Sequence, residues 1–201
     1  SQWKIGDEEC VIGHLATLSE AKGTCDLLRA ARRAWRDGAN FTIVLAGGRL
    51  RDFSRFWQDF DGKDRVRLLG PLSDQQKRNF FAGIDAFCMP SRTDSFGLVF
   101  LEAWANHKPV IGYRAGGVAE LIRHGEDGLL VRCGEIDSLA DSLSMMQRAD
   151  LRNELGNAGA ARLAVEFRWE EKLAVVEAVQ QRLTGRTSPD SEAASAPAHY
   201  R

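Results

Sequence analysis

The sequence has no excess of charge of one sign and no long apolar run. Its 27 lysines and arginines are balanced by 28 aspartates and glutamates, for a formal charge of -1. This balance gives no reason to expect attraction to nucleic acid or to an anionic membrane surface. No apolar stretch approaches the roughly 20 residues that span a bilayer, so we expect no transmembrane segment. No apolar stretch follows the charge at Lys4, so we do not expect the start to be a signal peptide.

Cysteines are few and widely spaced. Cys10, Cys25, Cys88 and Cys133 form no C-x-x-C pair. We therefore expect buried, reduced thiols rather than disulfides or metal ligands. Reduced thiols predict a cytoplasmic protein, either free or held at the inner face of the membrane through a parent protein.

Short apolar runs alternate with longer amphipathic ones. The runs are apolar at consecutive positions, which is typical of strands covered on both faces. Strands are predicted at 10–15, 41–46, 66–69, 86–89, 109–112 and 128–131, and helices at 24–36, 50–60, 73–82, 96–106 and 118–122. Ser73 and Gln76 have the spacing of a capping box that opens the third helix. Six repeats of this kind predict an α/β fold with a Rossmann-like, doubly wound, mostly parallel six-strand sheet.

The pattern after the last strand is helical only, at 136–146, 151–166 and 169–183. We expect these helices to form a carboxyl-terminal cap. Residues 184–201 are rich in Ser, Thr, Pro and Ala, which predicts a disordered tail. The expected organisation is a linker at 1–8, one domain at 9–183 and the tail. The linker would lead from an amino-terminal half that is missing from this chain.

Several connections follow the carboxyl ends of the predicted strands, where open α/β sheets bind ligands. Lys22 precedes a helix and could hold a phosphate with nearby backbone amides, although a solvated surface lysine explains it as well. Gly47 and the pair Gly116 and Gly117 would let the backbone approach a ligand. Simple tight turns account for these glycines equally well.

The connection after the fourth strand carries the strongest signal. Asp94 and Glu102 are separated by seven residues, so Glu102 would lie about two helical turns beyond Asp94. The amides of Phe96, Gly97 and Leu98 would open the helix without intrahelical partners and could bind hydroxyl or phosphate oxygens. A carboxylate can accept hydrogen bonds from adjacent sugar hydroxyls. Taken alone, Asp94 would be an ordinary helix cap and Glu102 an ordinary helix carboxylate.

The ordered series of motifs resembles the donor half of retaining glycosyltransferases of family 4, which have the GT-B fold. The motifs are Lys22-Gly23, Leu45-Ala-Gly, Leu69-Gly70, the run from Pro90 to Ala105, Lys108-Pro-Val-Ile-Gly, Gly116-Gly-Val-Ala-Glu-Leu-Ile, Gly125-Glu-Asp-Gly-Leu-Leu-Val and Phe167-Arg-Trp-Glu. The resemblance covers about residues 10 to 183 and implies one half of a GT-B fold.

The resemblance also implies roles for individual residues. Lys22 matches the phosphate-binding lysine, and Glu102 matches the acid that holds the ribose hydroxyls. Asp94 takes the place of the catalytic-site acid that faces the donor sugar, where the family usually has Glu. Its shorter side chain retracts the charge by roughly 1.5 Å. The remaining substrate contacts would come from the backbone at Phe96, Gly97 and Leu98, from the glycines Gly47, Gly70, Gly116 and Gly117, and from His14.

His14 stands where the family usually has an arginine that pairs with the lysine. It would supply at most a partial, pH-dependent charge, and Thr17 is the alternative equivalent because the loop is longer than usual.

The implied activity is transfer of a hexose-type sugar from a UDP-, GDP- or ADP-linked donor to an acceptor, with retention and without a metal or cofactor. Polysaccharide or glycolipid biosynthesis is the implied setting, and a glycan, a lipid or a small molecule is the implied acceptor. Because the acceptor site belongs to the absent half, we expect this chain to bind nucleotide sugar and to turn over poorly alone. A sugar-nucleotide epimerase and a non-catalytic nucleotide-sugar-binding or interaction module are the alternatives.

Asp59-Phe60-Asp61 fits the D-x-D pattern of metal-dependent transferases. It falls at the end of a predicted helix, so we interpret it as a chance match. The arginines Arg29, Arg32, Arg33 and Arg36 are predicted to form a solvated helix face rather than a nucleic-acid-binding patch.

Overall fold

The computed structural model describes residues 9–93 and 97–167. Its strands are β1 (Cys10–Leu15), β2 (Phe41–Ala46), β3 (Val66–Gly70), β4 (Ala86–Met89), β5 (Val110–Tyr113) and β6 (Gly128–Val131). All pair in parallel, in the order β3-β2-β1-β4-β5-β6. The predicted Rossmann-like, doubly wound sheet is confirmed, and the strand order reverses between β1 and β4.

The helices follow the strands as the periodicity predicts. They are α1 (Thr24–Arg36), α2 (Arg51–Asp59), α3 (Asp74–Gly83), α4 (Leu98–Ala105), α5 (Val118–Leu121), α6 (Ile136–Met145) and α7 (Ala149–Glu166), with a short 3₁₀ turn η1 (Lys63–Arg65). The Ser73 capping box is present, since Ser73 accepts from the Gln76 amide and Gln76 accepts from the Ser73 amide. The predicted helix at 169–183, the linker at 1–8 and the tail at 184–201 lie outside the described residues.

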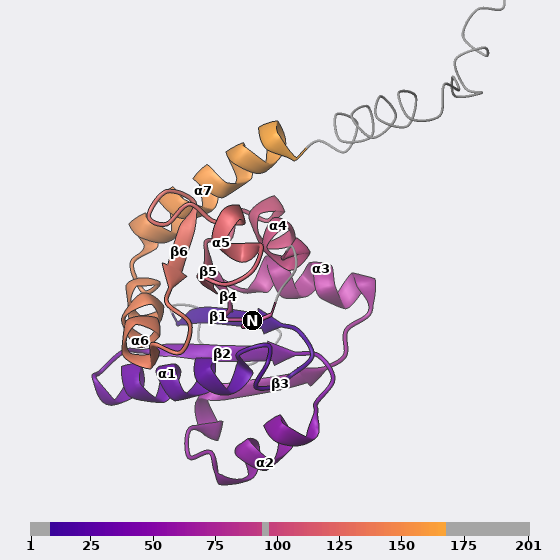
Figure 1. The fold of residues 1–201 in the computed structure, drawn as a ribbon, viewed down its shortest axis with the longest axis vertical. Helices are drawn as coiled ribbons and strands as arrows, with labels where there is room; N and C mark the ends of the chain where they lie inside the picture. Colours follow the sequence, from indigo (N-terminus) through magenta and orange to yellow (C-terminus); the bar gives the residue numbers. More distant parts are fainter. Residues whose placement is uncertain (1–8, 94–96, 168–201) are drawn as a thin grey trace, which may run out of the picture. The chain divides into compact units, whose positions relative to one another are not determined.

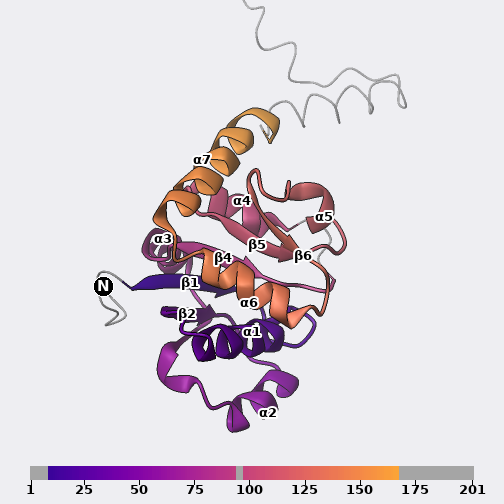
Figure 2. The same cartoon turned by 90° about the vertical axis from the view of Figure 1, so that its left-hand side faces the viewer.

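Alternate residues of each strand point to opposite faces of the sheet. On one face, Ile12, Ile43, Cys88 and Ile111 join a core with side chains of α1, α2 and α6. Helices α1 and α6 lie side by side over this face (Figures 1 and 2). On the other face, Gly13 lies so close to α3 that a Cβ there would stand 2.7 Å from atoms of Phe80 and Ile84.

The other face is filled by aromatic rings. Phe87 of β4 contacts Phe81 of α3 and Phe100 of α4, with ring centroids 5.7 Å and 5.6 Å apart. Apart from the edge strand β3, the strands are buried on both sides, which explains why their sequences are apolar at consecutive positions.

The middle of α7 packs closely on the end of α4 and on the loop that follows it. A Cβ on Gly156 would stand 2.2 Å from the His107 carbonyl oxygen, and one on Gly159 would stand 2.2 Å from the Trp104 ring. The first of two compact units of the chain runs to Ala161. Within the segment that follows it, Arg162 pairs with Glu166.

The predicted burial is confirmed for three of the four cysteines and is wrong for Cys133. Cys10, Cys25 and Cys88 are buried, Cys133 is exposed, and all four are free. Burial raises the pKa of Cys10 to about 12 and that of Cys25 to about 11.

Candidate functional site

The candidate site lies at the carboxyl edge of the sheet, where the loops after β1 and β4 meet. Gly23 has a φ of +73°, and a Cβ there would stand 1.9 Å from the Pro90 carbonyl oxygen. The Arg92 amide donates to the Ala21 carbonyl at 3.0 Å. The loop that carries Lys22 is thus packed against and hydrogen-bonded to the loop that leads to α4, at the point where the strand order reverses.

Lys22 is partly buried in this loop, and its amide donates to Ser19 Oγ at 3.2 Å. Its charge lies near enough to His14 to lower the pKa of that imidazole slightly further than burial does. The sequence-based expectation that Lys22 lies at the carboxyl edge of the sheet agrees with this arrangement.

His14 has a different setting from the one expected. Its side chain is fully buried, with one ring nitrogen 2.9 Å from the Cys88 carbonyl and the other 3.0 Å from Thr24 Oγ1. Burial lowers its pKa to about 4. The imidazole is therefore neutral at pH 7 and ties β1 to β4 and α1 instead of presenting a nitrogen to a ligand. Thr17, the alternative, is exposed.

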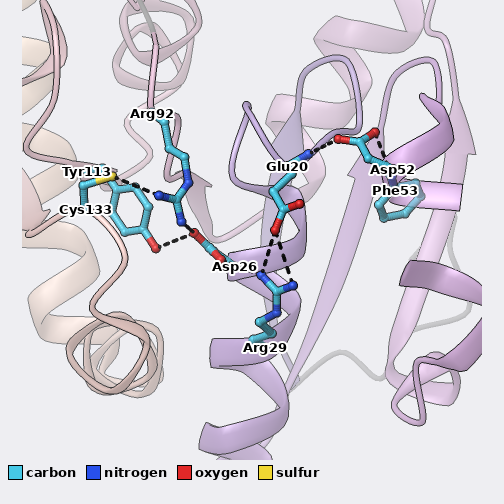
Figure 3. Close-up of polar contacts among 8 residues, drawn as sticks. All are labelled: Glu20, Asp26, Arg29, Asp52, Phe53, Arg92, Tyr113 and Cys133. Carbon is cyan, nitrogen blue, oxygen red and sulfur yellow. Dashed lines mark hydrogen bonds and ion pairs between the residues drawn. The ribbon is translucent and has the colours of Figure 1, made fainter. Parts of the chain in front are cut away.

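A buried carboxylate joins these loops on the α1 side (Figure 3). Asp26 is 2% exposed and accepts from Arg92 at 2.5 Å, from the Tyr113 hydroxyl at 3.1 Å and from Arg29 at 2.8 Å. Arg92 also lies over the Tyr113 ring and donates to the Cys133 thiol at 3.6 Å. Burial and the Asp26 charge both raise the pKa of Tyr113. One carboxylate therefore connects α1, the loop after β4 and the end of β5.

This junction was not predicted, because its members are far apart in the sequence. One signal was available: Asp26 stands four residues before Ala30 and eight before Ala34, on the buried stripe of α1. An acidic residue on an apolar helix stripe needs a partner.

Glu102 lies in the second half of α4, and its carboxylate contacts Lys77 of α3. The two side chains face a groove of about 290 Å³ between the helices. The sequence placed Glu102 in a helix but did not predict its pairing with Lys77.

The start of α4 is later than predicted. Gly97 precedes the helix with a φ of +74°, and a Cβ there would stand 2.7 Å from the Phe100 ring. Leu98 opens the helix and is 66% exposed. Asp94 and Phe96 lie outside the described residues.

The glycines fall at turns around this edge. Gly47 has a φ of +132°, and a Cβ there would stand 1.8 Å from the Ala16 carbonyl oxygen, so close packing of two loops already requires a glycine. Gly70 and Gly116 also have positive φ, and Gly117 precedes α5. Gly70 has open space around its Cβ position.

The D-x-D match is separate from this edge. Asp59 ends α2, and Asp61 forms ion pairs with Arg32 and Arg36. The arginines of α1 are engaged with acidic side chains and are partly or largely exposed, as predicted for a solvated face. Within residues 9–93 and 97–167, no group of three or more His, Cys, Asp or Glu side chains could hold a metal ion. No helix in that part of the chain combines the length and apolar character that crossing a membrane requires.

The strand order, with its reversal between β1 and β4, defines an open α/β domain of the kind that binds ligands at a topological switch point. Residues 1–162 match the model of the family "Glycosyl transferases group 1". The chain belongs to this family of glycosyltransferases, and its fold is that of one half of a GT-B enzyme.

The curated relatives that match this chain are longer than it is. A GDP-mannose-dependent alpha-(1-6)-phosphatidylinositol monomannoside mannosyltransferase of Mycobacterium tuberculosis is 30% identical over 179 residues, which cover 84% of this chain and 46% of the relative. An N-acetyl-alpha-D-glucosaminyl L-malate synthase of Bacillus anthracis is 27% identical over 89% of this chain and 47% of the relative. The chain thus spans about half the length of these relatives.

Solved structures share the fold. Anabaena HepE in complex with UDP and glucose superposes with a TM-score of 0.74 at 24% identity, over 89% of this chain and 49% of that one. The C-terminal domain of a glycosyl transferase group 1 family protein from Francisella tularensis gives a TM-score of 0.70 at 24% identity, over 80% and 87% of the two chains.

Proposed function

We propose that this chain is the donor-binding half of a retaining glycosyltransferase of family 4, which transfers a hexose-type sugar from a nucleoside-diphosphate donor. The observation that carries the proposal is the close packing of Gly23 against Pro90, at the point between β1 and β4 where the strand order reverses. It holds the Lys22 loop beside the connection that leads to α4, which supports a site that uses a cation and a carboxylate at this edge of the sheet.

Each proposed role follows from the chemistry of the group. Lys22 would neutralise the leaving diphosphate without a metal, and Glu102 would accept the ribose hydroxyls. Asp94 would face the donor sugar. The backbone around Phe96, Gly97 and Leu98 and the turns at Gly47, Gly70, Gly116 and Gly117 would complete the site. His14 would act indirectly, because its neutral ring fixes β1 against Cys88 of β4.

The acceptor would bind to a half that this chain does not contain, and transfer by this chain alone would be slow or absent. Relatives named for GDP-mannose and a neighbour solved with UDP support a nucleoside diphosphate as the ligand. They leave open whether the base is uracil, guanine or adenine. The parent enzyme would act in the cytoplasm or at the inner face of a membrane.

Calorimetric titration of the chain with UDP, GDP and ADP tests the proposal. We expect one nucleotide to bind, and Glu102→Ala to weaken it by about tenfold or more, the loss expected when a charged hydrogen-bond acceptor is removed. Glu154→Ala is the matched control, since Glu154 is an exposed carboxylate on α7.

Binding that is equal in Glu102→Ala and Glu154→Ala would contradict the assignment of Glu102. Failure of all three nucleotides to bind would favour a non-catalytic interaction module. Conversion of a sugar nucleotide to its epimer without an acceptor would favour the epimerase.

A further inference from the structure

Arg92 contacts the chain on both sides of Lys22. Its backbone amide donates to the carbonyl of Ala21 at 3.0 Å, and its guanidinium donates to Asp26 at 2.5 Å. Ala21 is the residue before Lys22, and Asp26 lies in the first turn of α1. One residue of the β4–α4 loop therefore spans the segment that carries the Lys22 side chain.

The side-chain part of this contact has several partners. The Asp26 carboxylate is 2% exposed, and its Oδ2 accepts from both Arg92 and the Tyr113 hydroxyl. The guanidinium of Arg92 also lies 6.0 Å from the centroid of the Tyr113 ring and donates to the Cys133 thiol. Figure 3 shows Arg92 and Tyr113 meeting at Asp26. Both terminal nitrogens of Arg92 thus have protein partners, which favours a role through these contacts over direct contact with a ligand.

The backbone beside Lys22 is held at further points. Gly23 packs against the Pro90 carbonyl oxygen, and the Lys22 amide donates to Ser19 Oγ at 3.2 Å. A lysine side chain loses much rotamer freedom when its ammonium binds an anion. Affinity rises when part of that ordering is already present before the ligand binds. A fixed loop around Lys22 is therefore an advantage for binding phosphate.

We propose that Arg92 is a positioning residue whose guanidinium, anchored on Asp26, fixes the loop of Lys22 so that the lysine ammonium meets the diphosphate of the bound nucleotide. The inference rests on the proposed function, in which Lys22 neutralises the leaving diphosphate. Arg92 itself does not touch the ligand. Its effect should therefore act through Lys22 and appear in the preference for a diphosphate over a monophosphate.

Calorimetric titration with UDP, GDP and ADP and with UMP, GMP and AMP measures this preference as the ratio of two dissociation constants. For the base that binds, we expect Lys22→Met to reduce the preference about tenfold or more, the loss expected for a charged hydrogen bond. Arg92→Met should reduce it about threefold to tenfold. In the double variant the reduction should stay within about twofold of that in Lys22→Met, because Arg92 then has no lysine to position.

Arg29→Met is the matched control. Arg29 donates to the other oxygen of Asp26 at 2.8 Å and pairs with Glu20 at 3.4 Å, and both partners belong to the β1–α1 loop or to α1. Its loss leaves the link to the β4–α4 loop in place, so the preference should change less than about twofold.

Arg92→Lys should restore part of the preference, because a lysine keeps a cationic donor for Asp26. Thermal unfolding verifies that each variant is folded. The Arg92 side chain is 40% exposed, so we expect Arg92→Met to fold, and the same comparison with Lys22→Met can be made with the milder Arg92→Lys.

An unchanged preference in Arg92→Met would overturn the inference, as would an equal reduction in Arg29→Met. A reduction in the double variant equal to the product of the two single reductions would also overturn it, because Arg92 would then act independently of Lys22. Any of these results leaves the proposed function standing if Lys22→Met still reduces the preference. An undiminished preference in Lys22→Met would contradict the phosphate role of Lys22 and the inference with it, and absence of nucleotide binding overturns both proposals.

Discussion

Gly23 and Pro90 are in such close backbone contact that no side chain larger than hydrogen fits between them. The Cα of Gly23 faces the Pro90 carbonyl oxygen, and the φ of +73° belongs to the left-handed region. The β1–α1 and β4–α4 loops can therefore approach this closely only because residue 23 has no side chain.

The first prediction concerns this contact. Gly23→Ala combines backbone strain with a steric clash, and we expect it to lower the free energy of unfolding by about 2–4 kcal/mol. Gly38→Ala is the control, because Gly38 has a φ of +94° and open space around it, so only the strain remains. Urea unfolding measures both. Equal losses would show that the contact between the loops can relax.

A second prediction follows from Asp26. Asp26→Asn places an amide group among the donors of Arg92, Arg29 and Tyr113, so two partly exposed arginines lose the counter-charge of a buried carboxylate. Because solvent screens the arginines, we expect a loss of about 1–3 kcal/mol in unfolding free energy. Asp37→Asn, which breaks an exposed pair with Arg33, should cost less than about 1 kcal/mol. A similar small loss in Asp26→Asn would contradict the role of the junction.

The third prediction is a pH dependence from His14. Its pKa is about 4 in the folded chain against 6.5 as the ordinary value, so the unfolded chain binds more protons between these values. The stabilisation is complete above pH 6.5, declines as pH falls through this window and is lost near pH 4. Its full size is about 3 kcal/mol.

Urea unfolding between pH 7.5 and pH 4.5 checks this dependence against His14→Gln, which does not titrate. The variant should be less stable than the unmodified chain at high pH, and the difference should shrink as pH falls. A constant difference would exclude His14 as the titrating group.

Thiol labelling provides the fourth prediction. In the folded chain, dithionitrobenzoate should modify Cys133 rapidly, whereas Cys10, Cys25 and Cys88 should react only after denaturation, because burial raises their pKa values. Cys133→Ser should abolish the rapid phase. Rapid modification that persists in Cys133→Ser would reveal local opening of the core.

The sequence predicts the sheet well because burial on both faces leaves a plain apolar pattern. Four strands begin and end at the predicted residues, and the edges of the other two differ by one residue. The start of α4 was less predictable. Phe96 and Gly97 fit a helical pattern, yet the positive φ of Gly97 places it before the helix.

Features of the site that depend on tertiary contacts could not be predicted. His14 has the same sequence neighbours whether its ring faces a ligand or the core, and only the positions of Cys88 and Thr24 decide between them. Likewise, Lys77 is one of several polar residues in its helix, and its contact with Glu102 depends on how α3 and α4 pack. Lys22 was placed correctly at the sheet edge because its position follows from the order of strand and helix alone.

The shared carboxylate of Asp26 has a consequence for how this family can vary. A single acid satisfies Arg92 and Tyr113, which lie 66 and 87 positions further along the chain. Replacement of Asp26, Arg92 or Tyr113 alone leaves the other two side chains without a partner in this junction. We therefore expect substitutions at these positions to be tolerated mainly in combination. Across homologues, the identities at these three positions should covary, even where the surrounding loops have diverged.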